Sequence, residues 1–280
     1  MLFIVNPISG VKDKKRIVAY LEKRGLKYVF TEYVNHAYEL ARDSQARIIV
    51  AVGGDGTVNE VARAISGTDK VLGVIPCGSG DGLALHLGLS RNYKQAIHDI
   101  LTGRIIKIDS AKVEDRDFFT VCGVGFDAQV SKLFSQHGKR GLFTYLKLGL
   151  KTWIQYTPQR YTLEVDNQSI QVEAMMITVG NGNQWGNQAK ITPLASVSDG
   201  FLDISVTQKF SIFYLPYILF LLMTGRLYKS RYVTFLRGKN VRIVRQGAGP
   251  THADGDWFEG GPVLDISIYQ RKLNVIVPQK

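Results

Sequence analysis

The chain has 280 residues, of which 45% are hydrophobic, 21% are charged and 10% are aromatic, and its formal net charge is +11. This length predicts roughly two domains with a large core, and the composition excludes a disordered, collagen-like or disulfide-framework protein. The two cysteines, Cys77 and Cys122, lie in apolar runs and favour a reduced, cytoplasmic setting. The first residues lack the basic and long apolar regions of a signal peptide, so we interpret them as a strand.

Strand and helix signals alternate through the first part of the chain. The apolar runs that predict strands cover residues 2–5, 28–31, 47–52 and 71–75. The segments with helical spacing of apolar residues cover 13–24, 36–42, 58–65 and 93–101. This order predicts an α/β domain over residues 1–104, with a parallel sheet and helices on both sides.

The pattern changes after residue 104, where strand signals dominate. Expected strands cover residues 105–113, 118–124, 161–165, 170–179, 201–207, 232–236, 241–245, 263–269 and 273–277. Expected helices cover residues 127–135, 142–156 and 211–223. We therefore predict a β-rich second domain over residues 105–280, a sandwich with inserted helices, whose final strand could also return to the first domain.

The positive charge is concentrated in two segments without any acidic residue. Residues 128–163 hold six bases, and residues 204–253 hold eight. Such segments indicate an anionic partner, either a membrane surface or a nucleic acid. The sequence shows no zinc-ligand spacing and no nucleic-acid-binding motif, so no nucleic acid is expected.

A long apolar run covers residues 210–224, inside the second acid-free segment. As a helix it would span roughly 22 Å, short of the roughly 30 Å hydrocarbon core, and Pro216 interrupts it. Two interpretations stay open. The run is either a buried helix of the core or an apolar element that enters a bilayer surface beside the bases.

Three glycine-rich loops of the first domain each follow an expected strand. They are residues 6–10 (Asn-Pro-Ile-Ser-Gly), 53–60 (Gly-Gly-Asp-Gly-Thr-Val-Asn-Glu) and 78–82 (Gly-Ser-Gly-Asp-Gly). The carboxyl ends of parallel strands lie at one edge of a sheet, so we expect the loops to lie together. Glycines let backbone N–H groups approach phosphate closely, and Thr57 and Ser79 can donate hydrogen bonds to it. Asp55 suits a magnesium–phosphate group or proton transfer.

Together these motifs resemble the catalytic domain of diacylglycerol kinases and sphingosine kinases, in the bacterial single-chain form. The resemblance extends to residues 125–128 (Gly-Phe-Asp-Ala), 180–182 (Gly-Asn-Gly), 198–203 and 254–256 (Asp-Gly-Asp). It implies two domains, the first similar to NAD kinases and phosphofructokinases and the second a β-sandwich. It also implies that ATP and a lipid substrate bind between them.

The resemblance carries site residues onto this chain. The implied ATP contacts are Asn6, Pro7, Ser9, Gly10, Thr31, Gly53, Gly54, Asp55, Gly56, Thr57, Asn59 and Ser79. The implied magnesium site uses Asp199 with the backbone carbonyls of Ser196 and Phe201. Asp256 stands where the family has its proposed general base, a glutamate, and Asp55 is the second candidate catalytic carboxylate.

The resulting hypothesis is an ATP- and Mg²⁺-dependent kinase of a primary hydroxyl on a membrane lipid, with diacylglycerol as the first candidate substrate. Residues 78–82 lack the Asn-Asp pair common in diacylglycerol kinases and look closer to sphingosine kinases, so a sphingoid base is the second candidate. A soluble kinase and a non-catalytic lipid- or nucleotide-binding protein are the rival hypotheses. The expected partners are the lipid and an anionic membrane, and the expected location is cytoplasmic and peripheral at the membrane, with a homodimer left open.

Overall fold

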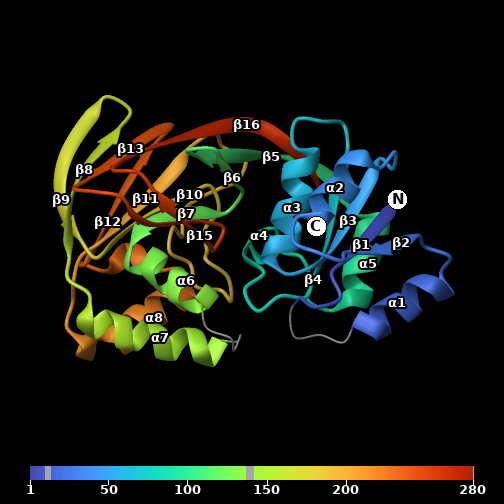
Figure 1. Ribbon diagram of the computed structural model, residues 1–280, viewed down its shortest axis with the longest axis horizontal. Coiled ribbons are helices and arrows are strands. Elements are labelled where there is room, and N and C mark those ends of the chain that lie inside the picture. Colours follow the sequence, from blue (N-terminus) through green and yellow to red (C-terminus); the bar gives the residue numbers. More distant parts are fainter. Residues whose placement is uncertain (10–13, 137–141, 280) are drawn as a thin grey trace. The chain divides into compact units, whose positions relative to one another are not determined.

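The computed structural model describes residues 1–9, 14–136 and 142–279, and it consists of two compact units (Figure 1). Unit 1 contains Met1–Asp109 and Gln270–Lys280, and unit 2 contains Ser110–Tyr269. Strands β5 (Arg104–Val113) and β16 (Val263–Val277) contribute residues to both units. The boundary expected from the sequence, after residue 104, falls at the first residue of β5.

Unit 1 is built on a parallel sheet with the strand order β2-β1-β3-β4, next to which the C-terminal part of β16 pairs in parallel with β4. The strands are β1 (Leu2–Val5), β2 (Tyr28–Phe30), β3 (Ile48–Gly53) and β4 (Val71–Pro76). The helices are α1 (Lys14–Lys23), α2 (His36–Asp43), α3 (Asp55–Ile65), α4 (Gly82–His86) and α5 (Tyr93–Thr102). The α/β domain expected from the sequence is confirmed.

The sheet of unit 1 is buried on both faces, which explains why its strands are almost entirely apolar. Alternate residues of a strand point to opposite faces. Phe3 and Val5 of β1 and Val50 of β3 share one core cluster with α1 and α5. The intervening residue Ile4 is equally buried but lies outside that cluster, on the opposite face. Two covered faces require a continuous apolar run rather than an alternating one.

Unit 2 is a sandwich of two antiparallel arrangements of strands. One sheet has the order β12-β11-β10-β7-β14-β15, and in the other β16 pairs with β13, β13 with β8 and β8 with β9. The strands are β6 (Arg116–Phe118), β7 (Val121–Gly125), β8 (Gln159–Val165), β9 (Gln168–Ala174), β10 (Met176–Gly180), β11 (Leu202–Thr207), β12 (Val233–Gly238), β13 (Asn240–Arg245), β14 (Gly249–Ala253) and β15 (Asp256–Gly260). Side chains from both sheets form one buried cluster, which includes Ile177, Ile204, Ile243 and Leu264. The predicted sandwich is confirmed.

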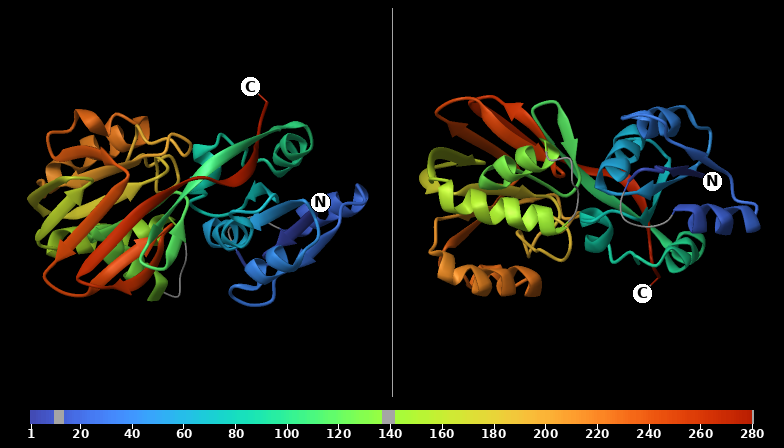
Figure 2. Two further views of the ribbon diagram at one scale, coloured as in Figure 1. Left: turned by 90° about the horizontal axis from the view of Figure 1, so that it is seen from above. Right: turned by 60° about the horizontal axis from the view of Figure 1, so that its bottom comes forward.

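The helices of unit 2 lie outside the sandwich (Figures 1 and 2). They are α6 (Phe126–Gln136), α7 (Leu142–Gln155), α8 (Leu215–Thr224) and the short 3₁₀ segments η1 (Ile212–Tyr214) and η2 (Leu227–Lys229). Pro216 lies in the first turn of α8, where its missing N–H costs nothing, and α8 ends at Gly225 with φ 68°. Within the described part of the chain, every helix is too short or too polar to cross a membrane.

Several boundaries differ from the sequence-based prediction. The single strand expected at 170–179 is two strands, β9 and β10, which pair in different sheets on either side of Met175. The strands expected at 263–269 and 273–277 are one continuous strand, β16. Strands β14 and β15 were not expected, because residues 249–260 are rich in glycine and polar residues. Pairing with β7 and with each other makes them strands.

Candidate functional site

The first group of site residues lies at the carboxyl edge of the parallel sheet in unit 1. Asn6 follows β1, Thr31 follows β2, Gly54 follows β3 and Cys77 follows β4. Backbone hydrogen bonds hold the loops at this edge. The Asn6 N–H donates to the Val52 carbonyl at 3.0 Å, and the Cys77 N–H donates to the Gly53 carbonyl at 2.8 Å. The edge predicted from the parallel-strand rule therefore forms from the predicted loops.

The Asn6 side chain joins the first loop to the second. Its amide nitrogen donates to Thr57 Oγ1 at 3.0 Å, and its amide oxygen accepts from the N–H groups of Ile8 and Ser9. Thr57 is only 4% exposed, because α3 begins at Asp55 and turns this side chain toward the sheet. The Asn6 contact fixes both loops at the N-terminus of α3, a position whose backbone dipoles favour an anion. Gly10, another predicted ATP contact, lies outside the described residues.

The Asp55 side chain joins the second loop to the third. Oδ1 accepts from the Gly82 N–H at 2.7 Å, and Oδ2 accepts from the Asp81 N–H at 2.9 Å. These amides belong to the first turn of α4, whose N–H groups have no partner within the helix. The carboxylate therefore serves as a cap supplied from a different part of the chain, in addition to lying at the predicted phosphate edge.

Two glycines let the second and third loops touch backbone to backbone. A Cβ at Gly78 would lie 2.7 Å from Gly54 Cα and 2.8 Å from Asp81 Oδ1. A Cβ at Gly54 would lie 3.2 Å from Gly78 Cα. The close approach, rather than a positive φ, explains why residues without side chains stand at these two positions.

Sequence reasoning missed three residues that organise this edge. Asp81 is 4% exposed and has a backbone φ of 53°. Its carboxylate accepts a hydrogen bond from the Gly78 N–H at 2.8 Å, and Arg91 Nε lies 3.1 Å from its Oδ2. Arg91 also donates to the Gly80 carbonyl at 2.9 Å. Lys14 donates to the Ser9 carbonyl at 2.5 Å. Asp81 stands inside a quoted motif and could have been found there, whereas Arg91 and Lys14 carry no local signal.

The second group of site residues lies in unit 2, around the start of β7. The Asp254 carboxylate accepts three backbone N–H groups, from Phe119 at 2.9 Å, Thr120 at 2.8 Å and Val121 at 3.2 Å. Asn181 reaches the same turn, because its side-chain amide donates to the Phe119 carbonyl at 2.8 Å and its backbone N–H donates to Thr120. Two motifs distant in sequence, at 180–182 and 254–256, are thus tied to one turn.

A buried polar group lies beside this turn, under β7. Asp127 Oδ2 accepts from Thr178 Oγ1 at 2.9 Å and lies 3.1 Å from His252 Nε2. All three residues are less than 4% exposed. A Cβ at Gly123 would lie 2.6 Å from Asp127 Oδ2, so glycine at this position makes room for the carboxylate. Burial is the main cause that raises the pKa of the neighbouring Cys122 thiol well above its usual value, so this cysteine stays neutral and is unsuited to act as a nucleophile.

Asp256 differs sharply from Asp254, although only Gly255 separates them. It is the first residue of β15 and is paired opposite Ala253 across the hairpin, and it is exposed. Gly255, with φ 89°, forms the turn between the two aspartates. Arg245 braces the other end of the hairpin, with its guanidinium donating to the carbonyls of Gly249, Gly260 and Gly261. The hairpin therefore holds one aspartate in a structural role and presents the other to solvent.

The expected magnesium residues lie in the loop before β11. Asp199 Oδ1 accepts from the Phe201 N–H at 3.1 Å, and its Oδ2 is bound by the Arg237 guanidinium. That guanidinium also stacks over the Phe201 ring, with 4.7 Å from Cζ to the centroid. Among the described residues, no three His, Cys, Asp or Glu side chains are grouped to hold a metal. An oxygen site at Asp199 would therefore depend on backbone carbonyls and would compete with Arg237.

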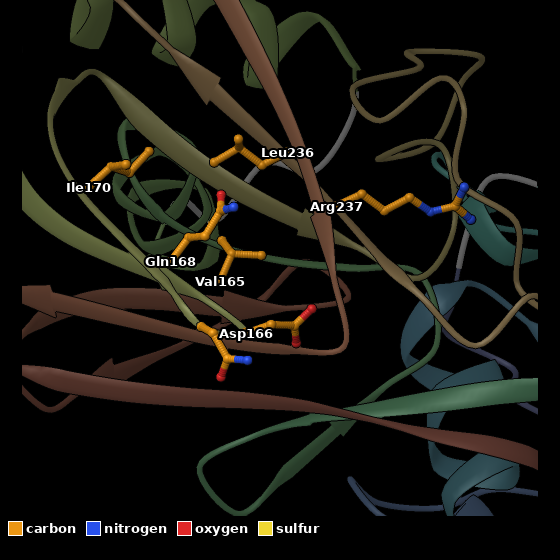
Figure 3. Close-up of a pocket in the computed structure, with 7 residues that line it drawn as sticks. Val165, Asp166, Gln168, Ile170, Leu236 and Arg237 are labelled. Atoms are coloured by element: carbon orange, nitrogen blue, oxygen red, sulfur yellow. The ribbon is translucent and has the colours of Figure 1, made fainter.

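A cavity of ≈ 320 Å³ in unit 2 is lined by none of the predicted site residues (Figure 3). The side chains of Val165, Gln168 and Leu236 turn toward one another there, while the Arg237 guanidinium points away. Asp166, at the rim, accepts from the N–H groups of Lys239 and Asn240, and these bonds lower the pKa of Asp166. Its polar group thus closes a turn rather than facing a ligand.

Comparison with known proteins matches both halves of the chain. Residues 1–113 match the model of the diacylglycerol kinase catalytic domain, and residues 120–277 match that of the YegS C-terminal NAD kinase beta sandwich-like domain. The chain is similar to proteins named diacylglycerol kinase from Staphylococcus carnosus strain TM300 (28% identity, 99% of this chain and 94% of that protein) and Bacillus subtilis strain 168 (26%, 99% and 96%). The protein of that name from Mycobacterium tuberculosis strain H37Rv is 28% identical, over 99% of this chain and 94% of that protein.

The fold is also shared with a solved structure. A crystal structure of a diacylglycerol kinase from Bacillus anthracis strain Sterne matches with a TM-score of 0.74 and 20% identity, over 99% of this chain and 96% of that chain. This likeness supports the fold alone. The two domain models, which together span the described motifs, and the full-length relatives identify the chain: it belongs to the diacylglycerol kinase-like family of lipid kinases.

Proposed function

We propose that this chain transfers the γ-phosphoryl group of ATP to the primary hydroxyl of diacylglycerol, giving phosphatidic acid and ADP. The observation that carries the proposal is the paired match of a diacylglycerol kinase catalytic domain and its C-terminal sandwich, together with relatives of that name over 99% of the chain. The loops at the carboxyl edge of unit 1 support it, since they are braced by Asn6 and Asp55 at the N-terminus of α3.

The nucleotide is proposed to bind at these loops. The proposed contacts are the set that the family resemblance implies, from Asn6 to Ser79, with the phosphates proposed at Gly54, Gly56 and Thr57. Backbone N–H groups at a helix N-terminus stabilise phosphate without a charged side chain. Asp55 is proposed to keep the second and third loops at the spacing that the phosphates need, through its bonds to Asp81 and Gly82.

Asp256 is proposed as the proton acceptor. In the transfer, the acceptor hydroxyl oxygen forms a bond to the γ-phosphorus, the bond from that phosphorus to the bridging oxygen breaks, and the hydroxyl proton passes to a carboxylate. Asp256 is exposed at the start of β15, whereas Asp254 is held by three backbone amides. This difference in exposure favours Asp256 over Asp254 for contact with a substrate.

Magnesium is proposed as the cofactor, because phosphoryl transfer develops negative charge that a divalent cation neutralises when bound. A separate structural cation is proposed at Asp199 with the carbonyls of Ser196 and Phe201, an oxygen set of the kind Mg²⁺ prefers. A lipid substrate also requires the chain to reach a membrane, and we propose a peripheral, cytoplasmic location at an anionic surface.

Phosphate transfer from γ-labelled ATP into a substrate panel tests the proposal. The panel holds diacylglycerol, monoacylglycerol, sphingosine, dihydrosphingosine and ceramide in mixed detergent micelles with Mg²⁺, beside soluble NAD and fructose 6-phosphate. Label in diacylglycerol is the expected result. Label in sphingosine alone would transfer the assignment to sphingoid bases, an interpretation that the Gly-Ser-Gly-Asp sequence at residues 78–81 favours. Label only in NAD or the sugar, or none at all, would overturn the proposal.

A further inference from the structure

Helix α8 is apolar on the side that faces the core and also on the side that faces solvent. Ile218, Leu221 and Leu222 are buried in a cluster with Trp153 of α7 and Phe210. On the outer side, however, the exposed fractions are 49% for Tyr217, 55% for Phe220 and 53% for Met223. A helix of a water-soluble surface normally places polar residues on its outer face, and one that is apolar all round is normally covered. The outer face of α8 therefore lacks the solvent-facing chemistry of an ordinary surface helix.

The apolar surface continues beyond α8 at both ends. Phe213 of η1 is 89% exposed, and Tyr228 of η2 is 50% exposed. Isolated exposed apolar residues are common, but contiguous ones mark an interaction surface. We call the set Phe213, Tyr217, Phe220, Met223 and Tyr228 the α8 apolar face. Figures 1 and 2 show α8 at the outside of unit 2, beyond the strands.

Basic residues follow this face along the chain. Arg226, Lys229 and Arg231 follow α8 and are exposed. Among the residues that the structure describes, none of these three forms an ion pair with a carboxylate; Arg231 instead lies over the ring of Tyr232, with 4.9 Å from Cζ to the centroid. Two other bases of the acid-free segment are paired with a carboxylate: Arg237 with Asp199 and Arg242 with Asp265. Exposed positive charge without a carboxylate partner therefore follows directly on the α8 apolar face along the chain.

We infer that the α8 apolar face is a membrane-docking element that lies in the interface of an anionic phospholipid bilayer. Aromatic side chains favour the boundary between headgroups and acyl chains, and neighbouring Lys and Arg side chains bind anionic headgroups. The ten residues of α8 span about 15 Å as a helix, half of the roughly 30 Å hydrocarbon core, so the helix lies along the surface rather than across it.

Charge decides between a bilayer and a second copy of this chain as the occupant. A symmetric pair formed through this face would bring the same flank of Arg226, Lys229 and Arg231 from both copies into one interface. Like charges brought together repel, whereas an anionic surface neutralises them. The acid-free composition of residues 204–253 offers no carboxylate within that segment to relieve the repulsion.

This inference rests on the proposed function and deepens it, because a kinase of a membrane-resident lipid needs a means of reaching it. The test is co-sedimentation of the full chain with vesicles of phosphatidylglycerol and phosphatidylcholine, compared with vesicles of phosphatidylcholine alone. We expect binding to the anionic vesicles that weakens at high salt. The double variant Phe213→Ser/Phe220→Ser should lose at least ten-fold in binding, while Ile170→Ser, which removes an exposed apolar residue from β9, should bind like the original chain.

A second pair of variants measures the contribution of positive charge to vesicle binding. Arg226→Glu/Lys229→Glu should weaken binding to anionic vesicles at least ten-fold. Lys23→Glu/Lys27→Glu makes the same change in net charge on exposed residues of unit 1 and should have little effect. Circular dichroism and the melting temperature confirm that each variant is folded. Equal loss in both charge pairs would show that net charge alone drives binding and would overturn the inference.

The two proposals can fail separately. If the chain binds vesicles through the α8 apolar face but labels no lipid in micelles, the proposed function fails and the docking surface stands. If it labels diacylglycerol in micelles but the Phe213→Ser/Phe220→Ser variant binds vesicles unchanged, the docking surface is wrong. Analytical ultracentrifugation measures the oligomeric state. If the original chain is a dimer and the Phe213→Ser/Phe220→Ser variant is a monomer, the α8 apolar face binds a second copy of the chain rather than a bilayer.

Discussion

The Asp55 carboxylate accepts a hydrogen bond of 2.7 Å from the backbone N–H of Gly82, 27 residues further along the chain. Its second oxygen accepts the Asp81 N–H, so one side chain caps α4 from the start of α3. This contact explains the aspartate between glycines in terms of loop spacing as well as charge. A substitution of Asp55 should therefore affect loop spacing as well as charge.

Asp55→Asn should sharply reduce ATP affinity and cost about 1–3 kcal/mol of stability, because an amide can accept only one of the two N–H groups with its oxygen and turns a donor toward the other. ATP binding by calorimetry and urea unfolding measure the two effects. Glu60→Gln is the control: Glu60 caps α2 in the same way, accepting from Asn35 and Ala37, and its loss should lower stability while ATP affinity stays close to the original. Unchanged ATP affinity in Asp55→Asn would contradict the assignment.

Substitution of the two aspartates of the β14–β15 hairpin should affect different properties: activity for Asp256 and stability for Asp254. Asp256→Asn should lower kcat by about 10²–10⁴-fold, the usual contribution of a general base, with the melting temperature unchanged because the side chain is exposed. Asp254→Asn should lower the melting temperature, because Asp254 accepts three backbone N–H groups. Asp256→Glu, which supplies the residue that the family resemblance implies at this position, should keep activity. A fully active Asp256→Asn would place the proton acceptor elsewhere.

Asp203 should make the chain less stable as the pH rises from about 4 to about 6. Burial raises the pKa of Asp203 to about 6, with Arg237 opposing the shift and Asp199 adding to it. In the unfolded chain the pKa of an aspartate is about 3.9, so between these values the folded form binds more protons and unfolding becomes easier as the pH rises. The whole effect is at most about 3 kcal/mol, at about 1.4 kcal/mol for each pH unit.

Urea unfolding between pH 3.5 and 7 measures this dependence. Asp203→Asn should remove the decline, because the amide does not ionise. Asp265→Asn is the matched control, since Asp265 is exposed and pairs with Arg242 on β13, and it should keep the decline. If Asp203→Asn and the original chain gave parallel curves, the buried carboxyl would not be the group responsible.

Arg237 should compete with a divalent cation for Asp199. Because the guanidinium already binds Asp199 Oδ2, Mg²⁺ should raise the melting temperature of the original chain only slightly. Arg237→Gln frees the carboxylate, so Mg²⁺ should raise the melting temperature of that variant several-fold more. Asp199→Asn combined with Arg237→Gln should abolish the response. If Arg237→Gln were no more responsive than the original chain, the proposed cation site at Asp199 would be wrong.

Much of the carboxyl edge of the unit 1 sheet could be predicted from the sequence because its signals are local. Strands buried on both faces appear as apolar runs, as at β1 and β3, and each glycine-rich loop follows its strand directly. The parallel-strand rule then brings loops from three strands to one edge without any knowledge of packing. The resemblance to a lipid kinase family, which the domain matches confirm, rests on the same contiguous motifs.

What only the tertiary structure decided depends on partners distant in sequence. Residues 249–260 look like a turn-rich loop, and they become β14 and β15 because β14 pairs with β7 and β15 pairs with β14. The same pairing separates a structural Asp254 from an exposed Asp256, and it is packing that pairs Arg237 with Asp199 and leaves Arg226 beside an exposed apolar face. The sequence by itself determined most of the elements, the family and the motif residues. The long-range contacts, which no local pattern encodes, determined which of those residues brace the fold and which face the solvent.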